Sequence, residues 1–339
     1  MVNRKARGVN PRLLVYRMSR AVLRRFNIRR ALQCAVQRNR KVILFRGIAS
    51  KPDWQVHFAS TEHFLHDIPA VLPRRRHDYR IAQNFMHQEF VDDPGPKVFF
   101  SREPEAVLTE ETRRNLSGLQ GLVNVLSFGE EDPEQRMYYV ALPSDRRGVV
   151  RRLEKTMHES RPRFCCIVNR HKSNDELELL RKRYDFVEVM QGAIDVYGRP
   201  PDEGPNPWDG FPGYRGAAGN KLRVLRSYTF NLCFENCDRD GYITEKMPHA
   251  LMAGCVPLYW GGGRFLEQTI PPACYINCKG KEPREVFQRI RSMPSEEVFS
   301  IRRAGLEFLA SPDADRFCWK FWATQCIDSL LVAGTDRAP

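Results

Sequence analysis

Short apolar runs alternate with helix-length segments through the second half of the 339-residue chain, and no other feature limits the fold as strongly. Strands are expected at Arg163–Val168, Phe186–Met190, Thr229–Glu235 and Cys255–Trp260. Helices are expected between them at Asp175–Tyr184 and Thr244–Ala253. Strands that alternate with helices form parallel sheets with right-handed crossovers, and ligands bind at the carboxyl ends of their strands. The sequence therefore predicts an α/β fold.

Strand-length runs also recur in the first half of the chain, which predicts a separate sheet there. They lie at Lys41–Gly47, Lys97–Ser101, Gly121–Phe128 and Met137–Leu142. The segment Pro143–Arg163 is charged and weakly patterned, as connections between domains often are. We therefore expect a boundary near residue 150, with an arm at 1–40, domains at 41–150 and 151–310, and a closing helix at 311–339.

The Gly- and Pro-rich segment Gly192–Asn220 interrupts the alternation of strands and helices. Proline and glycine at this density do not pack as a helix or a central strand. A long segment of this kind is either an ordered functional loop or a mobile lid.

The positive charge of the chain is concentrated at its start. The formal net charge is +13, but residues 1–50 hold 14 Lys and Arg and no acidic residue, while the other 289 residues carry 40 basic and 41 acidic side chains. Residues 11–40 show the pattern of a basic amphipathic helix, which either lies on an anionic membrane surface or packs on its own domain. The near-neutral body predicts no nucleic-acid partner.

The lack of a secretory or membrane-spanning segment and the spacing of the cysteines bear on the cellular compartment of the protein. No apolar run approaches the ~20 residues needed to cross a bilayer, and arginines interrupt every candidate secretory segment near the start. The ten cysteines lack the paired spacing of zinc sites, so we expect free, buried thiols. These features predict a cytoplasmic protein, peripheral at the inner face of the membrane if the arm binds lipid.

The stretch Tyr228–Gly263, YTFNLCFENCDRDGYITEKMPHALMAGCVPLYWGGG, concentrates the residues suited to ligand binding. A buried strand carries Glu235 and Asn236 to its carboxyl edge, and a helix begins near Thr244, which we expect to be its N-cap. The free N–H groups of the first turn, with the Lys246 charge, suit a diphosphate, and Glu245 can accept hydrogen bonds from sugar hydroxyls. This pattern predicts a nucleotide-sugar site.

The segments FNLCFEN, GYITEK and AGCVPLYWG within this stretch closely resemble the signature of the α-1,3-fucosyltransferases, glycosyltransferase family ten. Weaker matches are RFCCIVN at 163–169, IDVYGR at 194–199 and KVFFSREPE at 97–105. The resemblance implies a GT-B fold, with two Rossmann-like domains facing a cleft. It also implies a C-terminal domain that holds GDP-fucose, an N-terminal domain that presents the acceptor, and a last helix that crosses back.

Site residues carried over from the family lie mainly in these segments. The resemblance implies that Glu245 contacts the ribose and Lys246 the pyrophosphate. The other expected substrate-binding residues are Asn236, Tyr242, Glu235, Arg199 and an arginine, for which Arg170 is the nearest candidate and Arg181 and Arg183 are alternatives. The chain departs from the family at Val168, which replaces a serine, at Pro248 early in the helix, and in lacking a proline after Gly261.

The resemblance also implies an inverting reaction. One in-line displacement converts the β-linked fucose of GDP-fucose into an α-linked product, and a carboxylate must accept the proton of the acceptor hydroxyl. Glu103 is the expected base, with Glu105 as the alternative. We expect no metal, because the pair Asp238 and Asp240 only superficially resembles the metal-binding motif of other glycosyltransferases, and no cofactor. The acceptor class implied is an oligosaccharide or lipid-linked glycan, with N-acetylglucosamine as the default acceptor sugar.

Overall fold

A computed structural model describes residues 127–133, 136–169, 178–199, 206, 208–318, 321, 322, 325, and 114, 116 and 118–120. It also describes the backbone of strands at 41–46, 78–83, 97–100 and 122–126. The chain divides into unit 1, Met1–Ser127 with Ala323–Pro339, and unit 2, Phe128–Trp322.

Unit 1 contains a four-stranded parallel sheet in the order β1-β2-β3-β4. Its strands are β1 Lys41–Arg46, β2 Asp78–Gln83, β3 Lys97–Phe100 and β4 Leu122–Leu126. Three of them coincide with strands expected from the sequence, whereas β2 was not expected.

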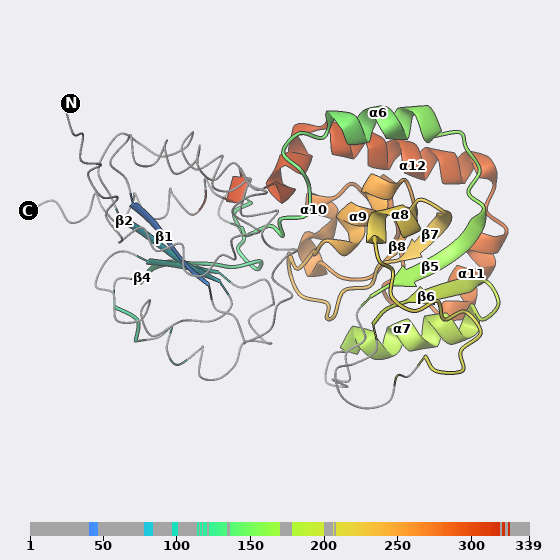
Figure 1. The fold of residues 1–339 in the computed structure, drawn as a ribbon, viewed down its shortest axis with the longest axis horizontal. Coiled ribbons are helices and arrows are strands. Elements are labelled where there is room, and N and C mark those ends of the chain that lie inside the picture. The colour runs from blue at the N-terminus through green and yellow to red at the C-terminus, as the bar shows by residue number, and fades with distance from the viewer. Residues whose placement is uncertain are drawn as a thin grey trace, which may run out of the picture. The chain divides into compact units, whose positions relative to one another are not determined.

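Unit 2 is built on a five-stranded, fully parallel sheet in the order β6-β5-β7-β8-β9 (Figure 1). The strands are β5 Arg163–Val168, β6 Ile194–Tyr197, β7 Tyr228–Leu232, β8 Val256–Tyr259 and β9 Ile276–Asn277. The helices are α6 Arg147–Thr156, α7 Glu178–Val189, α8 Lys221–Leu225, α9 Lys246–Ala253, α10 Leu266–Thr269, α11 Pro283–Arg291 and α12 Ser295–Ala310. In the described residues, 3₁₀ turns lie at Gly263–Phe265, Pro272–Cys274 and Pro312–Phe317.

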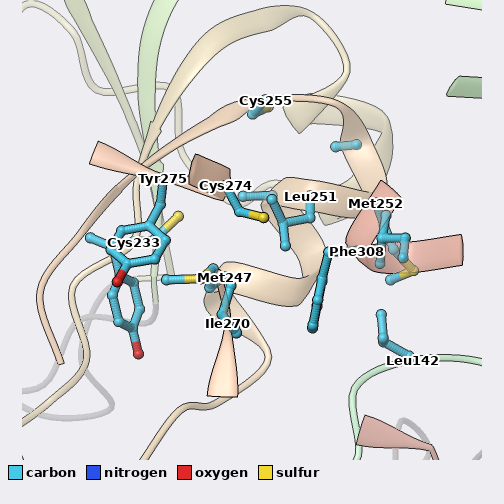
Figure 2. Packing of buried hydrophobic residues seen from close by; sticks show 14 of the residues in the cluster. Leu142, Cys233, Met247, Leu251, Met252, Cys255, Ile270, Cys274, Tyr275 and Phe308 are labelled. Atoms are coloured by element: carbon cyan, nitrogen blue, oxygen red, sulfur yellow. The ribbon is translucent and has the colours of Figure 1, made fainter. Parts of the chain in front are cut away.

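Helices cover both faces of this sheet, because alternate residues of its buried strands point to opposite sides. On one face Cys166, Tyr228 and Tyr259 pack with residues of α6, α9 and α12. Figure 2 shows the centre of this cluster, where Met247, Leu251 and Met252 of α9 lie near Phe308 of α12. On the other face, strand residues such as Ile167 and Phe230 pack with α7 and α11. The result is a three-layer α/β/α unit.

The expected strand Phe186–Met190 is wrong, because these residues are the end of α7 and its following turn. Leu179, Phe186, Val187 and Met190 are all buried, at the i, i+7, i+8 and i+11 spacing of one helix face. The apolar segment Phe186–Met190 has only five residues, and a segment of this length fits a buried strand as well as one face of a helix. The next strand begins instead at Ile194.

The division of the chain at Phe128 also differs from the boundary expected near residue 150. The segment before α6 belongs to unit 2, because Tyr138 and Leu142 are buried in its core. Leu142 also forms a parallel bridge with Cys318, so the expected strand Met137–Leu142 is reduced to this single bridge. Long-range packing, which local charge patterning does not report, decided this boundary.

The described part of the Gly- and Pro-rich segment packs against β6 and α7, as an ordered loop would and a mobile lid would not. Tyr214 forms a parallel bridge with Val196 of β6, and Trp208 stacks on Tyr184 of α7 with ring centroids 4.8 Å apart. A Cβ on Gly213 would lie 2.3 Å from the Ile194 carbonyl oxygen, so this close approach requires glycine. Of the two alternatives, the structure therefore favours the ordered loop for residues 208–220.

Eight of the ten cysteines lie in the described residues, and all eight are buried thiols that form no disulfide with one another. Burial raises the pKa of the Cys255, Cys274 and Cys278 thiols to about 12, so these groups are protonated at neutral pH. No helix in the described parts of the chain combines the length and hydropathy that a bilayer crossing requires.

Candidate active site

The carboxyl edge of the unit 2 sheet gathers the polar residues of the Tyr228–Gly263 stretch. After β7 the chain passes through Glu235 and Asn236 into a loop, and then enters α9 at Lys246. After β8 it passes through Gly261–Gly263, whose φ angles are all positive. Because β7 and β8 are adjacent and parallel, both connections leave the same edge of the sheet.

Glu235 and Lys246 form a buried ion pair at this edge. The Lys246 Nζ donates to Glu235 Oε2 and to Thr244 Oγ1, both at 2.8 Å. Glu235 also accepts hydrogen bonds from the Thr244 N–H at 2.8 Å, the Thr244 hydroxyl at 2.7 Å and the Tyr259 hydroxyl at 3.1 Å. Four donors therefore satisfy this carboxylate, whose side chain is 0% exposed.

This network changes the role expected for Glu235. A carboxylate with no exposed surface does not reach a ligand, so Glu235 positions Lys246 and the loop before α9. Lys246 retains 10% exposure of its side chain, and an ammonium has three protons, of which this network uses two. Burial by itself would lower the Lys246 pKa, but the charges of Glu235 and Glu245 raise it, so the group stays cationic.

Thr244 is not the N-cap of the helix, contrary to the expectation. Helix α9 begins at Lys246, and Glu245 occupies the N-cap without a side-chain cap hydrogen bond. The Thr244 hydroxyl is instead engaged with Glu235. Pro248 is the third residue of α9, where a missing N–H removes no intrahelical hydrogen bond. This departure from the family pattern is therefore compatible with the helix.

Arg183 of α7 lies beneath the same loop. Its Nη2 donates to the Phe234 carbonyl at 2.6 Å and to Asn236 Oδ1 at 2.9 Å. Burial lowers its pKa to about 10, while the charges of Glu235 and Glu245 act in the opposite direction. Of the three candidate arginines, Arg183 is the one the structure brings to Asn236; Arg181 is exposed on α7 and Arg170 lies outside the described residues.

Tyr242 is buried, with 1% exposure. Its ring packs edge to face against the ring of Phe128, with the ring centroids 5.3 Å apart. Gly241 precedes it with φ +68°, and a Cβ there would lie 2.0 Å from the Phe128 carbonyl oxygen. The loop before α9 is therefore held against residue 128 by a contact that requires glycine. Tyr242 anchors this loop rather than projecting from it.

Glu245 and Arg199 are the more accessible of the expected residues. The Glu245 side chain is 30% exposed and accepts from Lys221 Nζ at 3.5 Å. Arg199 follows β6 at the carboxyl edge and is exposed. Both can therefore be reached by a ligand at this edge, whereas Asn236 is largely buried against Arg183.

Two hydrogen-bond donors at this edge were not expected from the sequence. Asn169 follows β5 and Trp260 follows β8, and the Asn169 side-chain nitrogen and the Trp260 Nε1 are buried without a partner among the described residues. Their position directly after a buried strand was the available signal. Unsatisfied donors of this kind are free to bind a ligand.

Asp238 and Asp240 hold the loop after β8. Asp238 Oδ1 accepts from the Gly263 N–H at 2.8 Å, and its Oδ2 pairs with Lys279 at 2.7 Å. Asp240 accepts from the N–H of Arg264 at 2.9 Å and from its Nε at 2.7 Å. Backbone N–H groups and basic side chains of the protein itself thus engage these two carboxylates, and no group of three metal-ligating side chains occurs within the residues that the structure describes. Both expected bases, Glu103 and Glu105, lie outside the described residues.

The sequence of unit 2 matches a known family. Residues 158–299 match the family model described as glycosyltransferase family 10 (fucosyltransferase) C-term. The α-(1,3)-fucosyltransferase FucT of Helicobacter pylori is 31% identical over 134 residues, covering 37% of this chain and 27% of that protein. GDP-fucose protein O-fucosyltransferase 3 of Gallus gallus is 32% identical over 81 residues, covering 23% of this chain and 17% of that protein. The matches thus span less than a third of these relatives.

Solved structures resemble the chain over most of its length. A crystal structure of an α1,3-fucosyltransferase with GDP has a TM-score of 0.51 at 16% identity, covering 86% of this chain and 91% of that chain. A UDP-forming trehalose-phosphate synthase from Burkholderia xenovorans has a TM-score of 0.50 at 10% identity, covering 84% and 80%. At these identities the likeness establishes the fold, and it confirms the expected α/β fold of the GT-B type.

Proposed function

We propose, from the match of residues 158–299 to the glycosyltransferase family 10 model, that the protein is an inverting fucosyltransferase which uses GDP-fucose. The observation that carries the proposal is the Lys246 ammonium, held by Glu235 and Thr244 at the first turn of α9. The alternative is a GT-B glycosyltransferase with another nucleotide-sugar donor. A basic-arm nucleic-acid-binding protein is the less favoured reading, because the charge outside residues 1–50 is close to neutral.

The diphosphate of the donor would bind at the start of α9. The N–H groups of Lys246 and Met247 lie in the first turn, where helical N–H groups have no intrahelical acceptor. The remaining proton of the Lys246 ammonium adds a full charge, and the helix dipole favours an anion at this end. Glu245, half-buried beside Lys221, would accept hydrogen bonds from the ribose hydroxyls.

Arg183 is the arginine that we assign to the donor site. It shares Asn236 with the loop before α9, and no carboxylate lies within ion-pair distance of it among the described residues. A buried guanidinium without an acidic partner favours a bound anion. Asn236 and Tyr242 then shape the donor pocket, while Arg199 contributes from β6. Arg170 stays an untested alternative.

Inversion would proceed by one displacement at the anomeric carbon of fucose. The acceptor oxygen forms its bond to this carbon as the bond to the GDP phosphate oxygen breaks, and a carboxylate accepts the hydroxyl proton. We assign this base to Glu103, with Glu105 as the alternative. Lys246 and Arg183 would stabilise the negative charge that gathers on GDP. The reaction requires neither a metal nor a cofactor.

The acceptor and location follow from the resemblance and the basic arm. We propose an oligosaccharide or lipid-linked glycan acceptor, with α-1,3 transfer to N-acetylglucosamine. Residues 1–40 would attach a cytoplasmic enzyme to the inner face of an anionic membrane, where lipid-linked acceptors reside. Loss of liposome binding on deletion of residues 1–40 would support this attachment, and binding retained by the truncated chain would oppose it.

The donor assignment is tested by steady-state kinetics with calorimetric titration of GDP. Lys246→Met should lower kcat/KM by about 10²–10³-fold and weaken GDP binding, because it removes a charge at the diphosphate. Glu103→Gln should abolish turnover while GDP affinity stays unchanged, because the base does not contact the nucleotide. The control is Lys182→Met, which removes a half-exposed lysine of α7 that pairs with Asp185.

Three results would contradict the proposal. Binding of UDP but not GDP would favour the alternative donor. A normal rate for Lys246→Met would remove Lys246 from the site. A normal rate for Glu103→Gln would move the base to Glu105 or another group.

A further inference from the structure

Four arginines meet at the amino edge of the unit 2 sheet, opposite the candidate active site. This four-arginine cluster consists of Arg152, Arg161, Arg226 and Arg302. Arg161 and Arg226 precede β5 and β7, while Gly254, between α9 and β8, lies against two members of the cluster. A Cβ on Gly254 would lie 2.8 Å from Arg161 Nη2 and 3.8 Å from Arg302 Nη2. The guanidinium groups therefore share one small region.

Backbone carbonyls at helix ends are the hydrogen-bond partners of this cluster. Arg152 donates to the Met252 carbonyl and Arg161 to the carbonyls of Ala253 and Arg226. Arg302 donates to the carbonyl of Thr156 at 2.9 Å and to that of Glu159 at 3.2 Å. The carboxyl ends of α6, α8 and α9 thus face the cluster, each contributing roughly half a negative charge.

These helix ends do not balance the cluster. Three helix ends supply roughly −1.5 charges against four cations, and none of the four arginines has a carboxylate within 4 Å among the described residues. Burial lowers the pKa of Arg152, and the neighbouring Arg226 and Arg161 lower it further. Burial and Arg161 likewise lower the pKa of Arg302, while Cys255 and the Glu159 carboxylate, which lies beyond ion-pair distance, act in the opposite direction.

Arg226 is the member of the cluster whose positive charge has no partner among the described residues. Its half-buried guanidinium donates no hydrogen bond to any described residue, and its Nε is buried. The Nε atoms of Arg161 and Arg302 are also buried without a partner. Capping of helix ends therefore accounts for Arg152 and for part of Arg161 and Arg302, but not for Arg226.

We propose that the four-arginine cluster binds a phosphate group, as a phosphate monoester or diphosphate, at a site separate from the donor site. Four cations less roughly 1.5 charges from the helix ends leave an excess of roughly 2.5 positive charges, most of which a phosphate monoester of about −1.5 to −2 charges would offset at neutral pH. Guanidinium groups offer planar pairs of donors that suit phosphate oxygens. The phosphate comes either from a free molecule or from a lipid headgroup.

Calorimetric titration of the full chain with inorganic pyrophosphate tests the site. Arg226→Gln should weaken one binding event at least tenfold, whereas Arg223→Gln, which removes an exposed arginine of α8 three residues before Arg226, should stay within twofold of wild type. The donor site is intact in both variants, so any binding there is common to all titrations. Identical isotherms for wild type and Arg226→Gln would overturn the proposal.

Thermal unfolding separates an anion site from a structural role. Without anion, Arg226→Gln should unfold at the same or a higher temperature than wild type, because it relieves repulsion and breaks no hydrogen bond. Pyrophosphate should then raise the Tm of wild type more than that of the variant. A lower Tm for the variant without anion, or equal shifts with it, would show a structural arginine and overturn the proposal.

Vesicle sedimentation identifies the source of the phosphate. Phosphatidylcholine vesicles with and without phosphatidic acid are compared for wild type, Arg226→Gln and Arg223→Gln. A loss of binding confined to Arg226→Gln, and reversed by pyrophosphate in wild type, would support the site and assign it to lipid. Equal vesicle binding by all three, together with the calorimetric difference, would support the site and assign it to a free phosphate compound.

Discussion

The two edges of the unit 2 sheet handle buried charge in opposite ways. At the carboxyl edge Glu235, with no exposed surface, meets Lys246 and three further hydrogen bonds from neutral donors. At the amino edge Asp195 of β6 is 15% exposed and accepts from Arg163 at 2.7 Å, Arg215 at 2.8 Å and Tyr228 at 2.6 Å. The four-arginine cluster at this second edge has no acidic partner within ion-pair distance among the residues described.

The difference shows what each arrangement can do. A compensated pair in a closed network fixes the direction of one ammonium, which suits a site where a ligand must be held in one pose. An excess of cations stabilises the fold only when an anion is present. The same sheet thus combines a rigid site at one edge with an electrostatically incomplete one at the other.

The largest effect is expected when the carboxylate at each edge, Glu235 or Asp195, is replaced by its amide. Glu235→Gln should cost about 3–5 kcal/mol of unfolding free energy, because it leaves the buried Lys246 charge unpaired. Asp195→Asn should cost only about 1–2 kcal/mol, since two of its three partners are half-exposed arginines. Urea unfolding measures both, and equal losses would contradict the contrast between the edges.

A glycine from each edge gives a smaller test. Gly241→Ala should cost roughly 2–3 kcal/mol, because the residue has φ +68° and its Cβ would meet the Phe128 carbonyl oxygen. The control is Gly192→Ala, in the turn before β6, where φ is +84° but no atom lies within 4 Å of the Cβ; we expect roughly 1 kcal/mol. Similar losses on urea unfolding would show that the Phe128 contact is soft.

A third test separates the pH windows in which the two edges contribute to stability. Burial lowers the pKa of His249 on α9 from 6.5 to about 4, and Lys221 and Lys246 lower it further. Because the folded pKa lies below the unfolded one, the stability contributed by neutral His249 is complete above pH 6.5 and is lost as the pH falls toward 4. The slope is at most about 1.4 kcal/mol per pH unit.

His249→Gln should therefore flatten the stability profile between pH 6.5 and 4. Asp195 acts in a lower window. Burial raises its pKa, but hydrogen bonds from Tyr228, Arg163 and Arg215 outweigh burial and hold the pKa below 3.8. Its contribution is complete above pH 3.8 and is lost below it, so Asp195→Asn should lower stability above pH 3.8 and flatten the profile only below that pH. Urea unfolding across pH measures both, and a single shared window would contradict the assignment.

Local pattern predicted the strands better than the helices and boundaries. The strand at Arg163–Val168 was expected with the bounds that β5 has, because six apolar-rich residues between charged segments leave few alternatives. The continuation of α7 through Phe186–Val189 is not evident from local pattern, because an apolar run of five residues fits a strand as well as one face of a helix. The start of unit 2 at Phe128 depended on the burial of Tyr138 and Leu142, which nearby sequence does not report.

The sequence by itself determined the α/β fold, the placing of Asn236, Glu245 and Lys246 at one sheet edge, and the resemblance of residues 158–299 to glycosyltransferase family 10. These follow from residue type and spacing along one continuous stretch. Only the tertiary structure decided that the Glu235 carboxylate is fully buried and holds Lys246. It also decided that Arg183 reaches Asn236 and that four arginines meet at the opposite edge. Each depends on residues from separate elements, whose burial and partners exist only once the sheet and its helices have packed.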